Sequence, residues 1–348
     1  MKRPWSWLAA TISIAFALCL CGGCHTRGAE PKPATPTATP KVVLAPHRQQ
    51  SDLLPAPSTL PPGAERPPER SSDGSSACPK PFERGSSAPA EPCGALDCRA
   101  FADPAAALKY VLDQQHPLVL GVGEAHVQRD VPLAVSPTRL FARLLPVLCG
   151  TSRDIVIELW LGRSDCGDRS VEQVAQAQKP ITSAQAPTNQ GDFVELGREA
   201  KRLGIEPHAL RPSCDEYRSI VKAGASDVDQ MLTLVAQHTA ILAEQLLQRP
   251  EPADRPLVIT FGGAMHNDVQ PRPGQQAWTF GPELDKFTAH RYVELDLVVR
   301  EQVRDTSAWE AQPFYHHFSK DLMPTRTLLY RQGPHSFTLV FPKAKDTP

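Results

Sequence analysis

Short apolar runs alternate with stretches of helical spacing over the carboxyl-terminal two thirds of the chain. Apolar residues, interrupted only by Gly121 and Thr260, run consecutively at 118–122, 155–157 and 257–261, while residues 293–297 alternate apolar and polar. The consecutive runs are typical of buried strands, and the alternation is typical of a strand with one face buried. Apolar residues spaced by three and four predict helices at 104–115, 137–148, 192–203, 214–223 and 227–248. A weaker strand is expected at 205–210.

This order of elements predicts the fold class. Strands that alternate with helices indicate an α/β fold with a mainly parallel sheet flanked by helices. Two runs near the end, 327–330 and 337–341, flank Gly333-Pro334 and predict a hairpin, which gives the sheet a carboxyl-terminal antiparallel portion. Asp103-Pro104 is a typical helix start, with a capping side chain before a proline. We expect one domain over residues 93–345.

The amino-terminal residues 1–24 have the pattern of an export signal. Lys2 and Arg3 precede an apolar core from Trp7 to Leu20, which suits a signal peptide and is short for a membrane span. The core ends in Leu20-Cys21-Gly22-Gly23-Cys24, which resembles a bacterial lipoprotein signal except that cysteine replaces the usual leucine three residues before the last cysteine. Cys24 would then carry the lipid. Simple secretion and an uncleaved anchor are the alternatives, and all three place the protein in or beyond the cell envelope.

Residues 25–92 differ in composition from the rest of the chain. Fifteen of the 36 prolines lie here, among many alanines, serines and threonines, with no sustained periodicity. Proline disfavours helix and central strand, and such a segment buries too little apolar surface to fold alone. We expect a disordered tether that holds the domain away from a membrane.

Cysteine content agrees with export, and charge excludes one class of partner. Outside the signal, the six cysteines are Cys78, Cys93, Cys98, Cys149, Cys166 and Cys214. An even number in an oxidising compartment indicates disulfides, and Cys93 and Cys98 are close enough to close a small loop. The formal net charge of −1 gives no electrostatic case for nucleic acid binding. Oligomeric state is not fixed by these features.

Ionisable residues follow three of the expected strands. Glu124 and His126 end the first strand, Glu158 ends the second, and His266 follows the strand at 257–261. Because parallel strands end at the same edge of a sheet, these four side chains are candidates for one site. A carboxylate within an apolar run, as at Glu158, needs a partner. His208 and Arg211 are weaker candidates and are better explained as structural.

Two chemistries suit two imidazoles and two carboxylates. His126, His266, Glu124 and Glu158 are the donors for a divalent ion such as Mn, Co, Zn or Fe, which would acidify a bound water. The same residues also suit a metal-free set in which a carboxylate orients a histidine that activates water.

The motifs resemble the superfamily of ChaN-type haem-uptake lipoproteins, Tiki/TraB proteases and erythromycin esterases. The matching segments are Gly123-Glu124-Ala125-His126, Val156-Ile157-Glu158-Leu159 and Gly263-Ala264-Met265-His266, each at a strand end. The likeness covers about residues 118–299, and Gly262-Gly263-Ala264-Met265-His266 departs from the Gly-Asn-Gly-His form of the ChaN branch. The resemblance implies metal-dependent proteolysis for one branch, metal-free hydrolysis for another and haem binding for the ChaN branch.

Three functions are consistent with these observations. The first is an envelope-anchored hydrolase of a peptide or a small-molecule ester that uses Glu124, His126, Glu158 and His266. The second is a haem- or iron-binding uptake lipoprotein, which rests on the ChaN resemblance because no haem ligand is evident among the five tyrosines. The third is a non-catalytic envelope scaffold.

Overall fold

The computed structural model describes residue 78 and residues 90–131, 133–160, 182–223, 228–250 and 255–344, all within one compact unit, Arg70–Pro348. The expected signal with Cys24, most of the expected tether and Cys166 lie outside the described residues. Among the residues described, no helix is long and apolar enough to span a bilayer.

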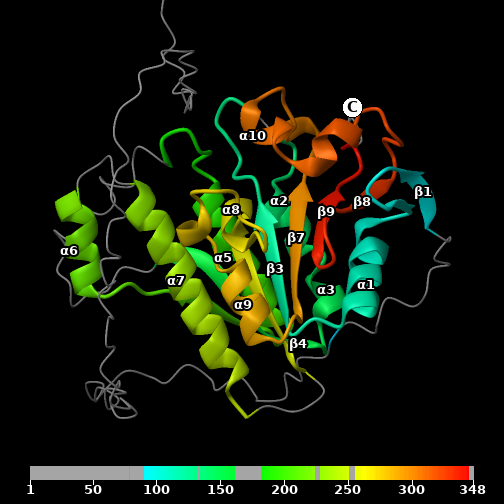
Figure 1. Cartoon of the computed structure of the whole chain (residues 1–348). Helices are drawn as coiled ribbons and strands as arrows, with labels where there is room; N and C mark the ends of the chain where they lie inside the picture. Colours follow the sequence, from blue (N-terminus) through cyan, green and yellow to red (C-terminus); the bar gives the residue numbers. More distant parts are fainter. Residues whose placement is uncertain are drawn as a thin grey trace, which may run out of the picture. The chain divides into compact units, whose positions relative to one another are not determined.

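A mixed sheet organises the domain (Figure 1). The spatial order of its strands is β1-β2-β8-β9-β7-β3-β6-β4-β5. Six neighbouring strands are parallel: β9 (Ser336–Val340), β7 (Tyr292–Val298), β3 (Val119–Glu124), β6 (Leu257–Gly263), β4 (Ser152–Trp160) and β5 (Glu206–Leu210). The strands β1 (Glu91–Gly94), β2 (Cys98–Phe101) and β8 (Thr327–Arg331) pair antiparallel at one side. The α/β fold class with an antiparallel portion is therefore confirmed.

Helices cover both faces of the parallel strands. On one face lie α1 (Pro104–Gln115), α2 (Pro137–Ala142), α3 (Leu145–Leu148) and α5 (Asn189–Arg202). On the other lie α7 (Val228–Leu247) and α9 (Gly281–Phe287), with the short α8 (Ala264–Asn267) directly after β6. The helix α6 (Cys214–Ala223) precedes α7, and α10 (Ser307–Glu310) follows β7.

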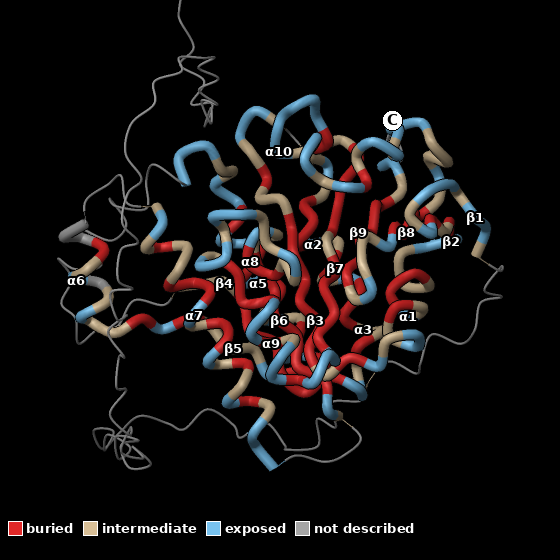
Figure 2. Tube along the Cα trace, viewed as in Figure 1, coloured by how far each residue is buried: buried red, intermediate tan, exposed pale blue. Residues whose placement is uncertain are grey.

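Burial follows the pleat of the strands. In β3, Leu120 and Val122 pack in the cluster that includes α1 and α5, whereas Val119 packs toward α7 and α9. Figure 2 shows the central strands β3, β4, β6, β7 and β9 as mostly buried, between helices that are partly exposed. Apolar surface is thus buried on both faces, which explains why these strands have consecutive apolar residues.

Two expectations need correction. Residues 137–148 form two short helices, because Pro146 has no N–H to continue the first. The strand at 292–298 is buried on both faces, since Tyr292 and Glu294 lie beneath α8 and α9. The predicted carboxyl-terminal hairpin is confirmed, since β8 and β9 pair antiparallel, and β9 joins the main sheet by pairing parallel with β7.

Disulfides fasten the amino-terminal edge. Cys93 is bonded to Cys98 across the turn between β1 and β2, which agrees with the small loop expected from their separation of five residues. Cys78, inside the expected tether, is bonded to Cys149, and Cys214 is also disulfide-bonded. The strand β1 begins two residues ahead of the domain boundary expected at residue 93.

Gly121 in β3 allows a close approach that a side chain would block. A Cβ at Gly121 would lie 2.6 Å from Cζ of the fully buried Tyr292, whose hydroxyl donates to the carbonyl of Asn267 at 2.6 Å. We expect Gly121→Ala to lower the free energy of unfolding by about 2–3 kcal/mol through overpacking. Gly191→Ala is the control, because nothing lies within 4 Å of its Cβ and alanine favours a helix by about 0.5–1 kcal/mol. Urea unfolding measures both, and equal effects would contradict the packing argument.

Candidate functional site

The four candidate side chains lie at the carboxyl edge of three neighbouring strands. β6 lies between β3 and β4, and Glu124 at the end of β3 is opposite Gly263 at the end of β6. Glu158 comes from β4, and His266 from α8, which starts where β6 ends. Parallel strands place their carboxyl ends at one edge, so side chains from distant parts of the sequence meet there.

Glu124 and His126 form a hydrogen-bonded pair. Nδ1 of His126 lies 2.7 Å from Oε1 of Glu124, whose side chain is buried. Burial alone lowers the pKa of His126, but the hydrogen bond to Glu124 and the charges of Glu124 and Glu158 outweigh it and raise the pKa to about 9. The imidazole is therefore charged at neutral pH. With Nδ1 bound to Glu124, Nε2 is the nitrogen left to face a substrate.

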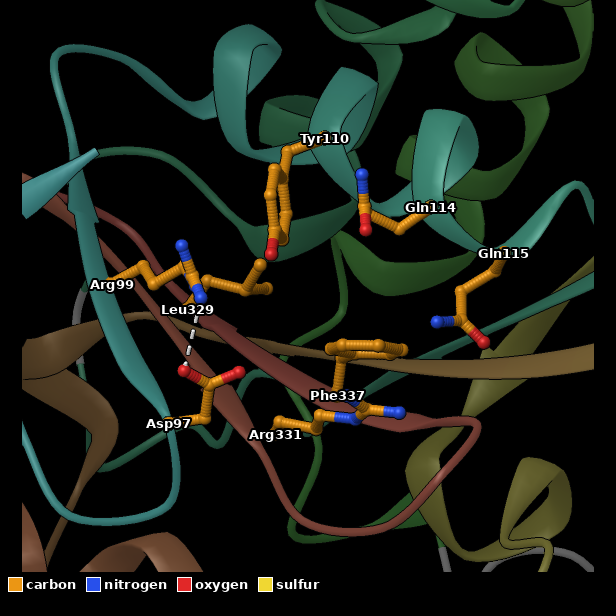
Figure 3. Close-up of a pocket in the computed structure, with 8 residues that line it drawn as sticks. All are labelled: Asp97, Arg99, Tyr110, Gln114, Gln115, Leu329, Arg331 and Phe337. Carbon is orange, nitrogen blue, oxygen red and sulfur yellow. Dashed lines mark hydrogen bonds and ion pairs between the residues drawn. The ribbon is translucent and has the colours of Figure 1, made fainter. Parts of the chain in front are cut away.

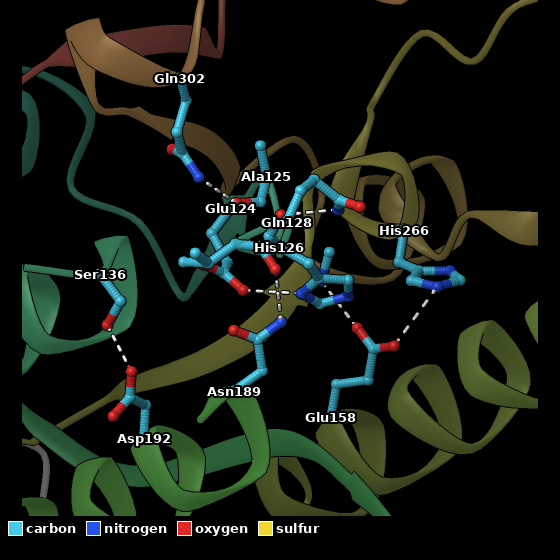
Figure 4. Close-up of polar contacts among 12 residues, drawn as sticks. Glu124, Ala125, His126, Gln128, Ser136, Glu158, Asn189, Asp192, His266 and Gln302 are labelled. Atoms are coloured by element: carbon cyan, nitrogen blue, oxygen red, sulfur yellow. Dashed lines mark hydrogen bonds and ion pairs between the residues drawn. The ribbon is translucent and has the colours of Figure 1, made fainter. Parts of the chain in front are cut away.

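Glu158 and His266 form the second pair (Figure 4). Oε2 of Glu158 accepts a hydrogen bond from the backbone N–H of Gly263 at 2.7 Å, and its Oε1 lies 3.7 Å from Nε2 of His266. Nδ1 of His266 donates to the carbonyl of Trp278 at 2.5 Å, which fixes its proton on Nδ1. A separation of 3.7 Å is too long for a direct hydrogen bond but suits a water held by both groups.

Gly263 is the point around which these groups gather. A Cβ at this position would lie 3.3 Å from Nε2 of His126 and 3.6 Å from both Oε2 of Glu158 and Cδ2 of His266. At the neighbouring Gly262, a Cβ would come within 2.9 Å of the Cβ of Glu158. The two glycines therefore leave space that the side chains of Glu158, His126 and His266 occupy, and this is a role that the sequence motif did not indicate.

Three amide side chains hold the backbone that carries His126. Gln302 donates to the carbonyl of Ala125 at 2.9 Å, Gln128 to that of His126 at 2.9 Å, and Asn189 to that of Val127 at 3.2 Å. Figure 4 shows Gln302 and Asn189 reaching this segment from other elements, whereas Gln128 belongs to the segment itself. Loop residues fixed in this way hold a side chain in one orientation. These amides were not recognisable in the sequence, since nothing there indicates that they are near His126.

A partly buried carboxyl group on β7, that of Asp296, was also missed. Oδ1 of Asp296 accepts from Nδ2 of Asn267 at 3.3 Å, beside Gly123. Burial raises the pKa of Asp296 to about 7, although the Asn267 hydrogen bond opposes it and the charge of Asp268 adds to it. In the sequence Asp296 was a polar position of an alternating strand, and it was interpreted as facing solvent.

The geometry does not fit a divalent metal. Among the residues that the structure describes, no three His, Cys, Asp or Glu side chains are placed to hold one ion. Nδ1 of His126 is bound to Glu124 and Nδ1 of His266 is bound to the carbonyl of Trp278, so each imidazole has only Nε2 left. The arrangement instead suits acid–base chemistry by the side chains themselves.

Other polar residues lie apart from these four. His208 on β5 lies with its Nε2 2.7 Å from Oδ1 of Asp154, in agreement with a structural role. Arg211 follows the end of β5 and is exposed. A small hollow beside α1 is lined by Asp97, Arg99, Tyr110, Gln114, Gln115, Leu329, Arg331 and Phe337 (Figure 3). Its volume of about 30 Å³ holds water but no substrate.

Comparisons with known proteins give distant likenesses only. No family model and no curated protein matches the chain. Among solved structures, the type III effector HopBA1 has a TM-score of 0.34 at 12% identity, covering 70% of this chain and 94% of its own. A Bacillus cereus protein has 0.32 at 10% identity, covering 70% and 93%. ChaN of Campylobacter jejuni, described with cofacial haem, has 0.28 at 12% identity, covering 55% and 85%. At these values the likenesses carry no functional argument.

Proposed function

We propose that this protein is a metal-free hydrolase that cleaves an ester or amide bond at the carboxyl edge of β3, β6 and β4. The observation that carries the proposal is the gathering of a charged imidazole, a carboxylate and a second imidazole around Gly263. One acidic and one basic group facing the same space is what hydrolysis requires.

Glu158 and His266 have the base role. A water between Oε1 of Glu158 and Nε2 of His266, which are 3.7 Å apart, is positioned by two acceptors. As its oxygen bonds to the substrate carbonyl carbon, its proton passes to Glu158. The hydrogen bond from Gly263 to the other carboxylate oxygen fixes the direction from which the water attacks.

His126 has the acid role. Its imidazolium carries a proton on Nε2 while Nδ1 is held by Glu124. That proton first stabilises the negative charge that develops on the substrate and then passes to the leaving group when the carbon–heteroatom bond breaks. The Glu158 proton passes to the solvent and the neutral His126 takes up a proton from the solvent, so both groups regain their starting states. Charge on His126 below pH 9 keeps this role available at neutral pH.

The amino-terminal pattern extends the proposal to location. Lipidation at Cys24 followed by a proline-rich tether would place the hydrolase in the cell envelope, attached to a membrane. The bonded pairs Cys93–Cys98 and Cys78–Cys149 support an oxidising compartment.

The test is a screen of nitrophenyl esters and fluorogenic peptides with the domain from about residue 70 onward, produced under oxidising conditions. We expect turnover that persists in EDTA and falls as pH rises through about 9, because only protonated His126 is an acid. Turnover that is lost in EDTA and restored by Mn, Co, Zn or Fe ions would contradict the metal-free assignment. No turnover, with a saturable Soret band on adding haem, would favour the uptake function instead.

A further inference from the structure

A groove of about 800 Å³ runs along the free side of the sheet. Its base is β5, and its walls are α5 on one face and α7 on the other. The lining residues are Ile157, Leu159, Phe193, Val194, Gly197, Arg198, Lys201, Glu206, Pro207, His208, Ala209, Leu210, Arg211, His238, Ile241, Leu242 and Gln245. None of them belongs to the four-residue site described above.

The base of the groove is an unpaired strand edge. Among the described strands, β5 pairs only with β4. Such an edge presents backbone N–H and C=O groups to any extended chain that lies beside it. Pro207 has no N–H, which is tolerated on an edge strand, and the neighbouring Ala209 retains both groups.

The two walls stand on opposite faces of the same strand. Pro207 faces α5, since a Cβ at Gly197 would lie 3.6 Å from its Cβ, whereas Leu210 packs in the cluster that includes α7. The side chains of an added strand point alternately to the two faces. These side chains would therefore contact α5 and α7 alternately, so the groove can accommodate one added strand.

Apolar side chains are exposed on each wall. Val194 of α5 is 38% exposed and Ile241 of α7 is 51% exposed, although both are large hydrophobic residues. Placed across an open strand edge from one another, they offer contacts to apolar residues at successive positions of an extended peptide. Phe193 also lies in this wall, with its ring 6.0 Å from that of His126.

A basic side chain lies near each end of the groove. Lys201 lies near the beginning of β5 and Arg211 directly after its end, and neither forms an ion pair with a described residue. Glu206 is the one acid in the lining, and Arg198 adds a third cation, itself paired with Glu195. A partner with acidic residues at both ends of a short apolar segment complements this pattern.

We infer that the groove binds an extended polypeptide segment as an additional strand beside β5, with apolar residues in its middle and acidic residues at its ends. Five residues of β5 span about 16 Å, so the segment has about five to seven residues. Strand addition derives affinity from backbone hydrogen bonds and specificity from side-chain contacts on alternate faces. The inference goes beyond hydrolysis, because it concerns binding at a separate set of residues.

The test measures binding alone. The probe is a fluorescein-labelled peptide in which valine and leucine occupy successive positions between terminal glutamates, so that both faces of the added strand are apolar. Fluorescence anisotropy follows its binding to the purified domain. We expect saturable binding that Ile241→Asp and Val194→Asp each weaken at least about tenfold, since a buried apolar contact is lost and an anion faces an anionic peptide. Phe287→Asp is the matched control, because Phe287 is 40% exposed and lies on α9, outside the groove.

Every other outcome overturns the inference. No binding at about 1 mM peptide, or equal weakening by Phe287→Asp, removes a site in the groove. Dimerisation of the free domain that Ile241→Asp abolishes would assign the groove to a second copy. Slow hydrogen exchange at Ala209 before peptide is added would show that the chain already covers this edge. None of these results depends on whether Glu158 supports turnover.

Discussion

Glu158→Gln is expected to lower kcat/KM about 1,000-fold while leaving the fold intact. The amide oxygen of glutamine still accepts the hydrogen bond that Gly263 donates at 2.7 Å, so the β4 end keeps its position. What is lost is the negative charge and the basic oxygen 3.7 Å from His266, and general-base catalysis contributes about 10²–10⁴-fold. Rates on the best substrate of the screen, with circular dichroism and melting temperature, measure both parts.

The control for Glu158→Gln is Glu199→Gln, which removes a carboxylate from α5 that pairs with Arg202 at the surface. Its rate is expected to equal that of the unchanged protein. Retention of more than about a tenth of the activity in Glu158→Gln would exclude Glu158 as the base, because the loss would fall below the range of general-base catalysis.

Glu124→Gln is expected to bring the pKa of His126 from about 9 to 6.5 or below. Burial alone lowers this pKa, and the hydrogen bond and charge of Glu124 are what raise it. His126 would then be largely neutral at pH 8, and the acid role would be lost there. The titration of His126 by nuclear magnetic resonance gives the pKa directly, and a value that stays near 9 would show that Glu158 alone holds the charge.

The same pair makes stability depend on pH in a defined direction. A histidine whose pKa is higher in the folded state than its ordinary 6.5 stabilises the fold fully below pH 6.5, and this contribution is lost as pH rises through about 9. From the difference between the two values we expect the free energy of unfolding to fall by about 3 kcal/mol across this interval. Urea unfolding at pH 6, 8 and 10 measures it, and Glu124→Gln should remove most of the decline.

The parallel sheet was predictable because its strands carry their own signal. Residues 155–157 and, apart from Thr260, residues 257–261 are apolar at consecutive positions, which is typical of a strand covered on both faces. The four site residues were recognisable for a related reason, since each follows such a run and ends a strand at one edge. Their pairing was not predictable, because it depends on β6 lying between β3 and β4.

Features that arise from tertiary contacts were missed. In the sequence Gly262 and Gly263 were only part of the motif that ends at His266, yet their lack of side chains makes room for Glu158 and His126. Asp296 looked solvent-facing because α8 and α9, which cover its strand face, were not expected at 264–267 and 281–287. The groove beside β5 depends on β5 being the edge strand of the sheet, and no local sequence pattern indicates which strand lies at the edge.

The position of β6 in the sheet determines when, during synthesis, the candidate site residues can come together. Its strand occupies the gap between β3 and β4, although synthesis reaches Leu257 long after β4 is complete at Trp160. Until that late segment inserts, Glu124 and Glu158 stand on strands that have no common neighbour, and Gly263 and His266 are missing from between them. A nascent or truncated chain that lacks this segment therefore has no complete set of candidate site residues, and the set comes together only when the sheet is complete.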